Sequence, residues 1–444
     1  MSELPKGWNH TTLNSVGSWG SGGTPKRTNK DYYDGKIPWL VIGDLNDGLV
    51  NQSKNTITEL GVQNSSAKLI DEGTLLIAMY GSIGKLGITG FKCATNQAIA
   101  NCTVNEELVN KKYLFYYLKS RQEHLLSMGK GGAQQNISQT VLKAYDCPIA
   151  PLNEQIRIAD KLDSILAKVD AAQARLDKIP NILKRFRQSV LAAATSGELT
   201  KEWREKNSIL ELWRDTTIGD LCVESFYGPR FSKNDYTEDG IPTIRTTDMT
   251  SSGVIEITEK TPKVNCPEGK VELFRAKKDD LLITRTGSIG TMAIFKGNYL
   301  AIPSAYLIRF RFNRDVIIEY LYYFLTSPIG KMHLGLGTTS VAQPNINAQT
   351  IKSIELKLPP YVEQQEIIRR VESLFTMADT VEKQYKDAKA KTDRLTQSIL
   401  SKAFRGELVP QDENDEPAGE LIKRITEMQM KLKKVTVKKL KPRR

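Results

Sequence analysis

The residue types that usually carry catalysis are sparse in this chain of 444 residues. Its three histidines lie far apart, and no pair of Cys or His has the spacing of a zinc site. Gly81-Ser82-Ile83-Gly84-Lys85 has too few residues between its glycines for a phosphate-binding loop. No Gly-x-Gly-x-x-Gly follows an expected strand. We therefore expect no metal and no cofactor bound by this chain.

Two short sequences resemble parts of DNA-modifying active sites but lack the necessary groups. Leu358-Pro359-Pro360-Tyr361 is close to the Asp/Asn-Pro-Pro-Tyr motif of adenine methyltransferases. Leu358 has no side-chain oxygen to accept a hydrogen bond from the adenine amino group, and prolines entering a helix are the simpler interpretation. Glu355-Leu356-Lys357 could belong to a nuclease site, but no Pro-Asp precedes it at a useful spacing. We expect no catalytic residues.

What remains is polar chemistry suited to DNA, in a chain with a net charge of +12. The stretches 22–27 and 228–233 place glycine beside Arg or Lys, so that backbone can approach phosphate closely while a cation contacts phosphate or guanine. Amides in 134–136 and 343–345 can pair with adenine edges. Taken singly, each of these residues could equally lie on a solvated loop. The candidate DNA contacts are Lys26, Arg27, Tyr80, Ser82, Lys85, Gln135, Asn136, Arg230, Lys233, Arg245, Arg285, Thr286, Ser288 and Asn345.

The candidate loops occur in pairs because the chain contains one unit twice. Pro151-Leu152-Asn153-Glu154-Gln155 returns 209 residues later as Pro360-Tyr361-Val362-Glu363-Gln364, and Gly81-Ser82-Ile83-Gly84 returns at 287–290. Before that turn, Met79-Tyr80 becomes Arg285-Thr286. A shared frame with altered polar side chains is what one fold reading two targets would look like. Drift on two solvent-exposed faces would look the same.

Each copy is predicted to be a mixed, strand-rich domain followed by a long helix. Short apolar runs predict strands at 74–80 and 280–286, and helices are expected at 111–121 and 319–327. The long helices carry heptads whose matched phase favours packing on each other, although two amphipathic helices in separate cores remain an alternative. Pro180 predicts a kink or break. The seam comprises Ile158, Leu162, Ile165, Val169, Leu176, Ile367, Val371, Leu374, Val381 and Tyr385.

These features predict an α+β chain of five segments. Two recognition domains occupy 1–150 and 210–358, two spacer helices 151–200 and 359–410, and a basic tail 411–444. No apolar run is long enough for a transmembrane helix, so we expect no membrane association. Five scattered cysteines fit a reduced, cytoplasmic protein.

The chain resembles the specificity subunit of a type I restriction–modification system over about residues 1–410. The resemblance rests on the duplication, the Pro-Leu-x-Glu-Gln helix start, the Gln-Ser-Val/Ile-Leu…Gly-Glu-Leu helix end and the Gly-Ser-Ile-Gly turn. It implies two target-recognition domains separated by two antiparallel coiled-coil helices, in a pseudo-two-fold arrangement. Each domain would read one half of a split site in double-stranded DNA.

The resemblance also implies a non-catalytic subunit in a bacterial or archaeal cytoplasm. Its partners would be two methylation subunits, which modify adenine at N6, and restriction subunits, which cut unmodified DNA. S-adenosylmethionine, ATP and Mg are expected on those partners.

Helix geometry suggests how the half-sites are spaced. Asn153–Ile179 would extend roughly 40 Å as a helix, and one turn of DNA is about 34–36 Å. An antiparallel pair would then place the domains on successive major grooves, leaving a fixed gap of unread bases. The alternative functions are a coiled-coil adaptor without sequence-specific DNA binding and an enzyme with an unrecognised site.

Overall fold

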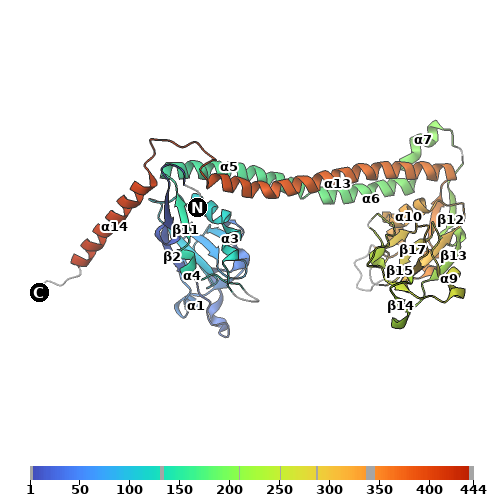
Figure 1. The fold of residues 1–444 in the computed structure, drawn as a ribbon, viewed down its shortest axis with the longest axis horizontal. Coiled ribbons are helices and arrows are strands. Elements are labelled where there is room, and N and C mark those ends of the chain that lie inside the picture. Colours follow the sequence, from blue (N-terminus) through green and yellow to red (C-terminus); the bar gives the residue numbers. More distant parts are fainter. Residues whose placement is uncertain are drawn as a thin grey trace. The chain divides into compact units, whose positions relative to one another are not determined.

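Two compact units make up the chain in this computed structural model, which describes residues 4–130, 135–209, 211–250, 252–286, 289–336 and 346–439, without the side chains of 429–439. The first unit comprises Met1–Leu176 with Asp387–Arg444, and the second comprises Asp177–Lys386. The elements of each unit can be followed in Figure 1. Each unit therefore joins one globular domain to helical segments from both copies of the repeat. The five segments proposed from sequence stay a prediction.

The globular domain of the first unit is built on mixed sheets. One sheet has the order β2-β10-β7-β8-β4 and another β5-β3-β9-β6, while β1 pairs with β11. The pairs β4–β8 and β3–β9 are parallel and the others antiparallel. The strands are β1 (Asn9–Thr12), β2 (Gly17–Ser21), β3 (Tyr33–Leu40), β4 (Gly48–Val50), β5 (Thr56–Ile57), β6 (Leu69–Ile70), β7 (Leu75–Ala78), β8 (Leu86–Thr89), β9 (Cys93–Thr95), β10 (Ile99–Val104) and β11 (Asp146–Ile149). The helices are α1 (Glu59–Gln63), α2 (Lys111–Ser120), α3 (Gln122–Ser127) and α4 (Gln139–Lys143).

The second unit repeats this plan. Its sheets have the orders β13-β20-β17-β18 and β14-β16-β15-β19, and β12 pairs with β21. The strands are β12 (Arg214–Thr217), β13 (Cys222–Tyr227), β14 (Tyr236–Thr237), β15 (Ile241–Ile244), β16 (Lys263–Val264), β17 (Leu281–Thr284), β18 (Met292–Ile294), β19 (Ile302–Pro303), β20 (Leu307–Phe312) and β21 (Glu355–Leu358). The helices are α7 (Lys201–Lys206), α8 (Ile218–Leu221), α9 (Glu268–Phe274), α10 (Ile318–Thr326), α11 (Pro328–His333) and α12 (Ala348–Lys352).

Equivalent backbone hydrogen bonds confirm the duplication. The Gly84 N–H donates to the Ala78 carbonyl at 3.0 Å after β7, and the Gly290 N–H donates to the Thr284 carbonyl at 3.1 Å after β17. Both glycines have φ near +80°, a conformation that favours glycine. The predicted strands at 74–80 and 280–286 are confirmed as β7 and β17. The predicted helices are confirmed as α2 and α10.

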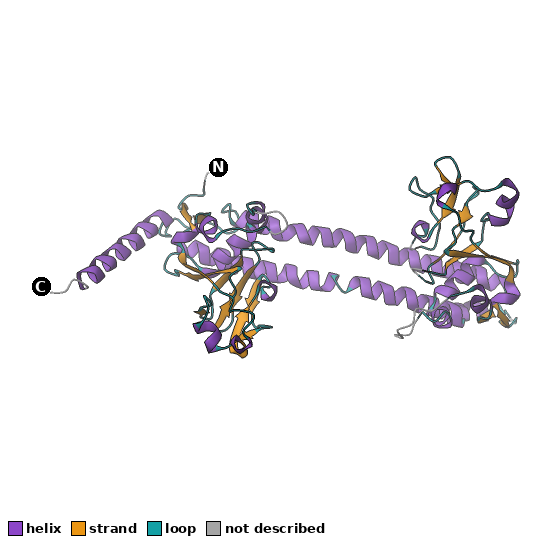
Figure 2. Cartoon of the chain, turned by 90° about the horizontal axis from the view of Figure 1, so that it is seen from below, coloured by secondary structure: helices purple, strands orange, loops and turns teal. Residues whose placement is uncertain are grey.

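The long helices begin where the sequence predicts. The first copy forms α5 (Leu152–Leu176) and α6 (Ile179–Ser196), and the second forms the single helix α13 (Tyr361–Ala403). Figure 2 shows a break in one of the long helices, which lies between α5 and α6. The break confirms the effect expected of Pro180, which occupies the first turn of α6. A further helix, α14 (Ala418–Lys439), lies in the predicted basic tail. No helix in the described part of the chain has the length and apolarity needed to cross a membrane.

In the second unit α6 and the first part of α13 run antiparallel. The Arg187 guanidinium pairs with Asp379 at 2.7 Å and with Glu382 at 3.1 Å, whereas Thr200 donates to Glu363 at 2.7 Å. Residue numbers therefore rise on one segment as they fall on the other. The predicted α+β fold with tandem domains and long antiparallel helices is confirmed.

The predicted heptad seam is buried only near the globular domains. Ile158, Leu162, Val169, Ile367 and Val371 are buried. The residues Ile165, Leu176, Leu374 and Tyr385 are half-buried. In contrast to the seam prediction, Val381 is 42% exposed. Its neighbours Asp379 and Glu382 bind Arg187, so polar contacts replace an apolar stripe at that level.

The Glu-Gln pair at each helix start holds its globular domain by buried hydrogen bonds. In the first unit the Trp8 indole donates to Glu154 at 3.1 Å, and Gln155 accepts from the Asn110 N–H at 2.8 Å. In the second unit the Trp213 indole donates to Glu363 at 2.9 Å. All four Glu and Gln side chains lie in residues that are at most 1% exposed. The motif therefore does more than start a helix.

Each unit is completed by residues of the other repeat. In the second unit Glu363 also accepts hydrogen bonds from Thr200 and Arg204, which follow the first long helix. In the first unit Arg157 pairs at 2.7 Å with Asp415, which follows the second long helix. The segment after each helix thus docks beside the beginning of the other helix.

Candidate nucleic-acid interface

In the first domain, tertiary contacts gather four of the candidate residues on one surface. The turn after β7 pairs with a loop about 55 residues away, because the Gly81 N–H donates to the Gln135 carbonyl at 3.2 Å and the Ile137 N–H donates to the Met79 carbonyl at 2.9 Å. The surface formed by Tyr80, Ser82, Gln135 and Asn136, all exposed, is called the amide face below. The amide face offers side-chain amides and a tyrosine with which to contact base edges.

The basic candidates of the first domain lie outside the amide face. Lys26 and Arg27 are exposed on a loop that no hydrogen bond or ion pair among the described residues links to the amide face. That loop is held by Tyr33, whose hydroxyl donates to the Pro25 carbonyl at 2.6 Å, and by the Trp39 indole, which donates to the Gly23 carbonyl at 3.1 Å. The remaining candidate of this domain, Lys85, is half-buried.

In the second domain, the fold brings Arg230, Arg285 and Thr286 together around a pocket of about 620 Å³. Phe231, Tyr236 and Tyr306 also line it. We call this feature the arginine pocket. Arg230 comes from the loop after β13 and Arg285 from the end of β17, so only the sheet makes them neighbours.

The Arg285 guanidinium has a fixed support. Its carbon lies 4.9 Å from the centre of the Tyr227 ring, a cation–π distance. The Tyr227 hydroxyl in turn accepts a hydrogen bond from the Ala348 N–H at 3.0 Å, at the start of α12. The Arg285 N–H donates to the Tyr306 carbonyl at 2.9 Å. The backbone and the charged group of Arg285 are therefore both held.

Of the other candidates of the second domain, one is engaged elsewhere, one is close to the arginine pocket, and two lie outside the described residues. Arg245 donates to the Lys260 carbonyl at 3.0 Å and lies 3.7 Å from Asp248, so its guanidinium is engaged within the protein. Lys233 is exposed next to the pocket but does not line it. Ser288 and Asn345 lie outside the described residues.

Sequence reasoning missed the exposed aromatic side chains that line the arginine pocket or support Arg285. Tyr306 is 63% exposed, Tyr236 is 48% exposed and Tyr227 is 40% exposed. An aromatic residue in a strand-rich domain is normally assigned to the core, so the sequence did not indicate that these side chains are exposed. It also missed Trp8 and Trp213, although Trp-x-x-Thr-Thr recurs in both copies and signals the repeat.

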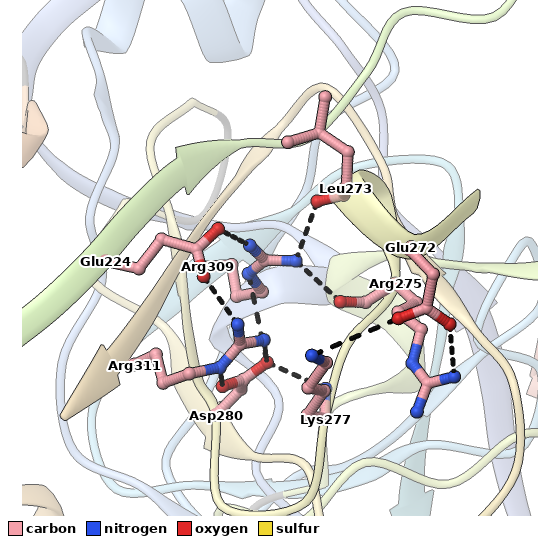
Figure 3. A network of polar contacts seen from close by, with 8 residues as sticks. All are labelled: Glu224, Glu272, Leu273, Arg275, Lys277, Asp280, Arg309 and Arg311. Atoms are coloured by element: carbon pink, nitrogen blue, oxygen red, sulfur yellow. Dashed lines mark hydrogen bonds and ion pairs between the residues drawn. The ribbon is translucent and has the colours of Figure 1, made fainter. Parts of the chain in front are cut away.

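A buried charge network stabilises the sheet that carries the arginine pocket (Figure 3). Arg309, 1% exposed, bonds Glu224 and the carbonyls of Leu273 and Arg275. Arg311 binds Asp280 through two hydrogen bonds of 2.8 Å and also contacts Glu224. Burial lowers the pKa of Arg309 from its usual value, and the nearby carboxylate of Glu224 opposes that shift.

Two further observations concern metal binding and cysteine reactivity in the described part of the chain. No group of three or more His, Cys, Asp or Glu there could hold a metal ion. Burial raises the pKa of Cys93 and Cys102 to about 12, so neither thiol is an available nucleophile at neutral pH.

The family model described as the type I restriction modification DNA specificity domain matches this chain twice, over residues 5–181 and 211–389. The chain belongs to this family. The match confirms the resemblance inferred from the duplicated motifs, and each copy of the model covers one globular domain with the beginning of its long helix.

Relatives and solved structures agree with this assignment. The StySPI specificity subunit of Salmonella potsdam is 32% identical over 94% of this chain and 92% of its own length. The EcoKI specificity subunit of Escherichia coli K12 is 31% identical, with the same coverage. The HsdS subunit from Thermoanaerobacter tengcongensis shares the fold with a TM-score of 0.56, at 18% identity over 91% of this chain and 98% of that one. A chain from a study of type I R-M complex assembly has a TM-score of 0.68, at 17% identity over 92% and 100% of the two chains.

Proposed function

We propose that this specificity-family chain reads a split double-stranded DNA site, one half with each globular domain. One observation carries the proposal. The turns after β7 and β17 are closed by equivalent backbone hydrogen bonds of Gly84 and Gly290, yet one is flanked by the amide face and the other by the arginine pocket. A constant frame with different polar side chains is suited to reading two different sequences.

The proposed partners supply the chemistry. Two methylation subunits would methylate adenine at N6, and restriction subunits would cut unmodified DNA, with S-adenosylmethionine, ATP and Mg bound by those partners. The relatives named as specificity subunits of type I restriction enzymes support this assignment. In this proposal the chain itself performs no catalysis and acts in the cytoplasm.

The long helices are proposed to set the gap between the half-sites and to dock the methylation subunits. The single helix α13 contributes to both compact units without an interruption. A continuous helix has a fixed rise of about 1.5 Å per residue, which makes it a suitable spacer.

The experiment is sequencing of modified bases in DNA from cells that express this chain with and without its methylation subunits. We expect a split motif with one methylated adenine in each half and a gap of constant length, present only when both proteins are made. Methylation by this chain alone would indicate an enzyme. Absence of methylation, with soluble and associated proteins, would indicate an adaptor. A gap of variable length would contradict the spacer role.

A further inference from the structure

We propose that Arg285 reads a guanine in the half-site of the second domain, and that the first domain has no equivalent reader. The inference rests on the proposed function and assigns a base to one site within it. It starts from the arginine pocket, where two guanidinium groups meet on a concave surface.

The arginines of the pocket lack a carboxylate partner among the described residues. None of the residues that line it is a carboxylate, and no ion pair of Arg230 or Arg285 occurs within the described part of the chain. Elsewhere in the same unit, Arg204, Arg309 and Arg311 each bind a carboxylate. The pocket arginines therefore keep donors for a ligand.

A second polar group in the pocket also lacks a partner. Ser304 is 8% exposed, and its hydroxyl oxygen has no hydrogen-bond partner within the described part of the chain. Burying an unpaired hydroxyl costs free energy, and a bound ligand with polar edges would recover it. The pocket is thus incomplete in polar contacts as well as in charge.

Guanine fits the support of Arg285 better than a phosphate does. The Tyr227 ring, 4.9 Å from the guanidinium carbon, restricts where that group lies, and a positioned guanidinium can donate two parallel hydrogen bonds. The O6 and N7 atoms of guanine accept that pair in the major groove. A phosphate can also accept two hydrogen bonds from a guanidinium, but it carries no sequence information and would give no reason for the two domains to differ at this position.

In the first domain, other residues occupy the positions of Arg285 and Tyr227. The N–H of Met79 donates to the Ala98 carbonyl at 2.8 Å, as the N–H of Arg285 does to the Tyr306 carbonyl at 2.9 Å, so Met79 is the counterpart of Arg285. Met79 is 4% exposed and belongs to the core. By strand register Ser21 takes the place of Tyr227.

The test compares wild type, Arg285→Lys and Arg285→Gln in the full chain expressed with its methylation subunits, by sequencing modified bases genome-wide. Lysine keeps the charge over Tyr227 but cannot form the paired hydrogen bonds. We expect one G·C position in one half-site to become degenerate in both variants, with discrimination there falling about tenfold to a hundredfold. The other half-site should not change.

Arg214→Lys is the matched control, because Arg214 is exposed, pairs with the exposed Asp315 and does not line the arginine pocket. It should leave every position of the motif unchanged. Three results would overturn the assignment. The first is an unchanged motif in Arg285→Lys, and the second is a change at an A·T position. The third is a loss of methylation that is uniform over all motif positions and occurs in Arg285→Gln alone. The last result would indicate a phosphate contact. A wild-type chain without any split motif would instead refute the proposed function, and the guanine reader with it.

Discussion

At equivalent points after β7 and β17, the first domain buries Met79 in its core while the second holds Arg285 against the ring of Tyr227. The N–H groups of these two residues donate to the equivalent carbonyls of Ala98 and Tyr306. The difference shows that polar side chains beside the turn can change while the turn is kept. In a duplicated protein this lets the two halves diverge in what they contact without loss of the fold.

The two domains also differ beneath that surface. Positions occupied by Arg309 and Arg311 on β20 correspond to Asn101 and Thr103 on β10, as the strand register shows. Asp280 likewise takes the place of Thr74. The second domain therefore depends on buried charges where the first uses neutral groups.

The largest effect expected from this contrast is that of Arg309→Ala. Removing the guanidinium leaves the carbonyls of Leu273 and Arg275 without a donor and Glu224 with one partner fewer, which should cost about 3–5 kcal/mol of local stability. The counterpart Asn101→Ala should cost about 1 kcal/mol. Hydrogen exchange of β17 and β20 against β7 and β10 measures both. Equal losses of stability in the two domains would show that the charged network contributes no more stability than the neutral groups do.

The buried glutamates give a contrast of intermediate size. Glu363→Gln should cost about 2 kcal/mol, because Arg204 and Thr200 both depend on that carboxylate. Glu154→Gln should change stability by less than about 0.5 kcal/mol. Burial raises the pKa of Glu154, so its charge is less favourable there than in water, and the amide oxygen of Gln can still accept from Trp8. Denaturant unfolding of each variant measures the difference, and a larger loss for Glu154→Gln would refute this account.

The smallest effect is a pH dependence at the helix surface. Hydrogen bonding to Arg369, and secondarily to Arg370, lowers the pKa of Glu366 to about 2, whereas the first repeat has Arg157 at this position. A lowered pKa means that the stabilisation is present above the usual value of 4.5 and is lost as pH falls toward 2. We expect a contribution of about 0.5 kcal/mol. Unfolding of wild type and Glu366→Gln should converge near pH 2, and a constant difference from pH 6 to pH 2 would contradict the shift.

Local and repeated features could be predicted from the amino-acid sequence. The duplication, the strands before the Gly-Ser-Ile-Gly turns, the helix starts at Pro151 and Pro360 and the break at Pro180 all depend on short-range geometry. The seam prediction was wrong at Val381, since a heptad pattern does not show where a polar partner such as Arg187 replaces the apolar stripe.

Only the tertiary structure decided which distant groups meet. The sequence marks Glu154 and Glu363 as helix-start residues, but their indole partners lie about 150 residues away. Arg285 was a candidate by type alone, whereas Tyr227 and the arginine pocket emerge only when β13, β17 and β20 are adjacent. The reason is physical. Hydrogen bonding within a turn or helix depends on neighbours in the chain, while a pocket depends on which strands pair and which side chains their register brings face to face.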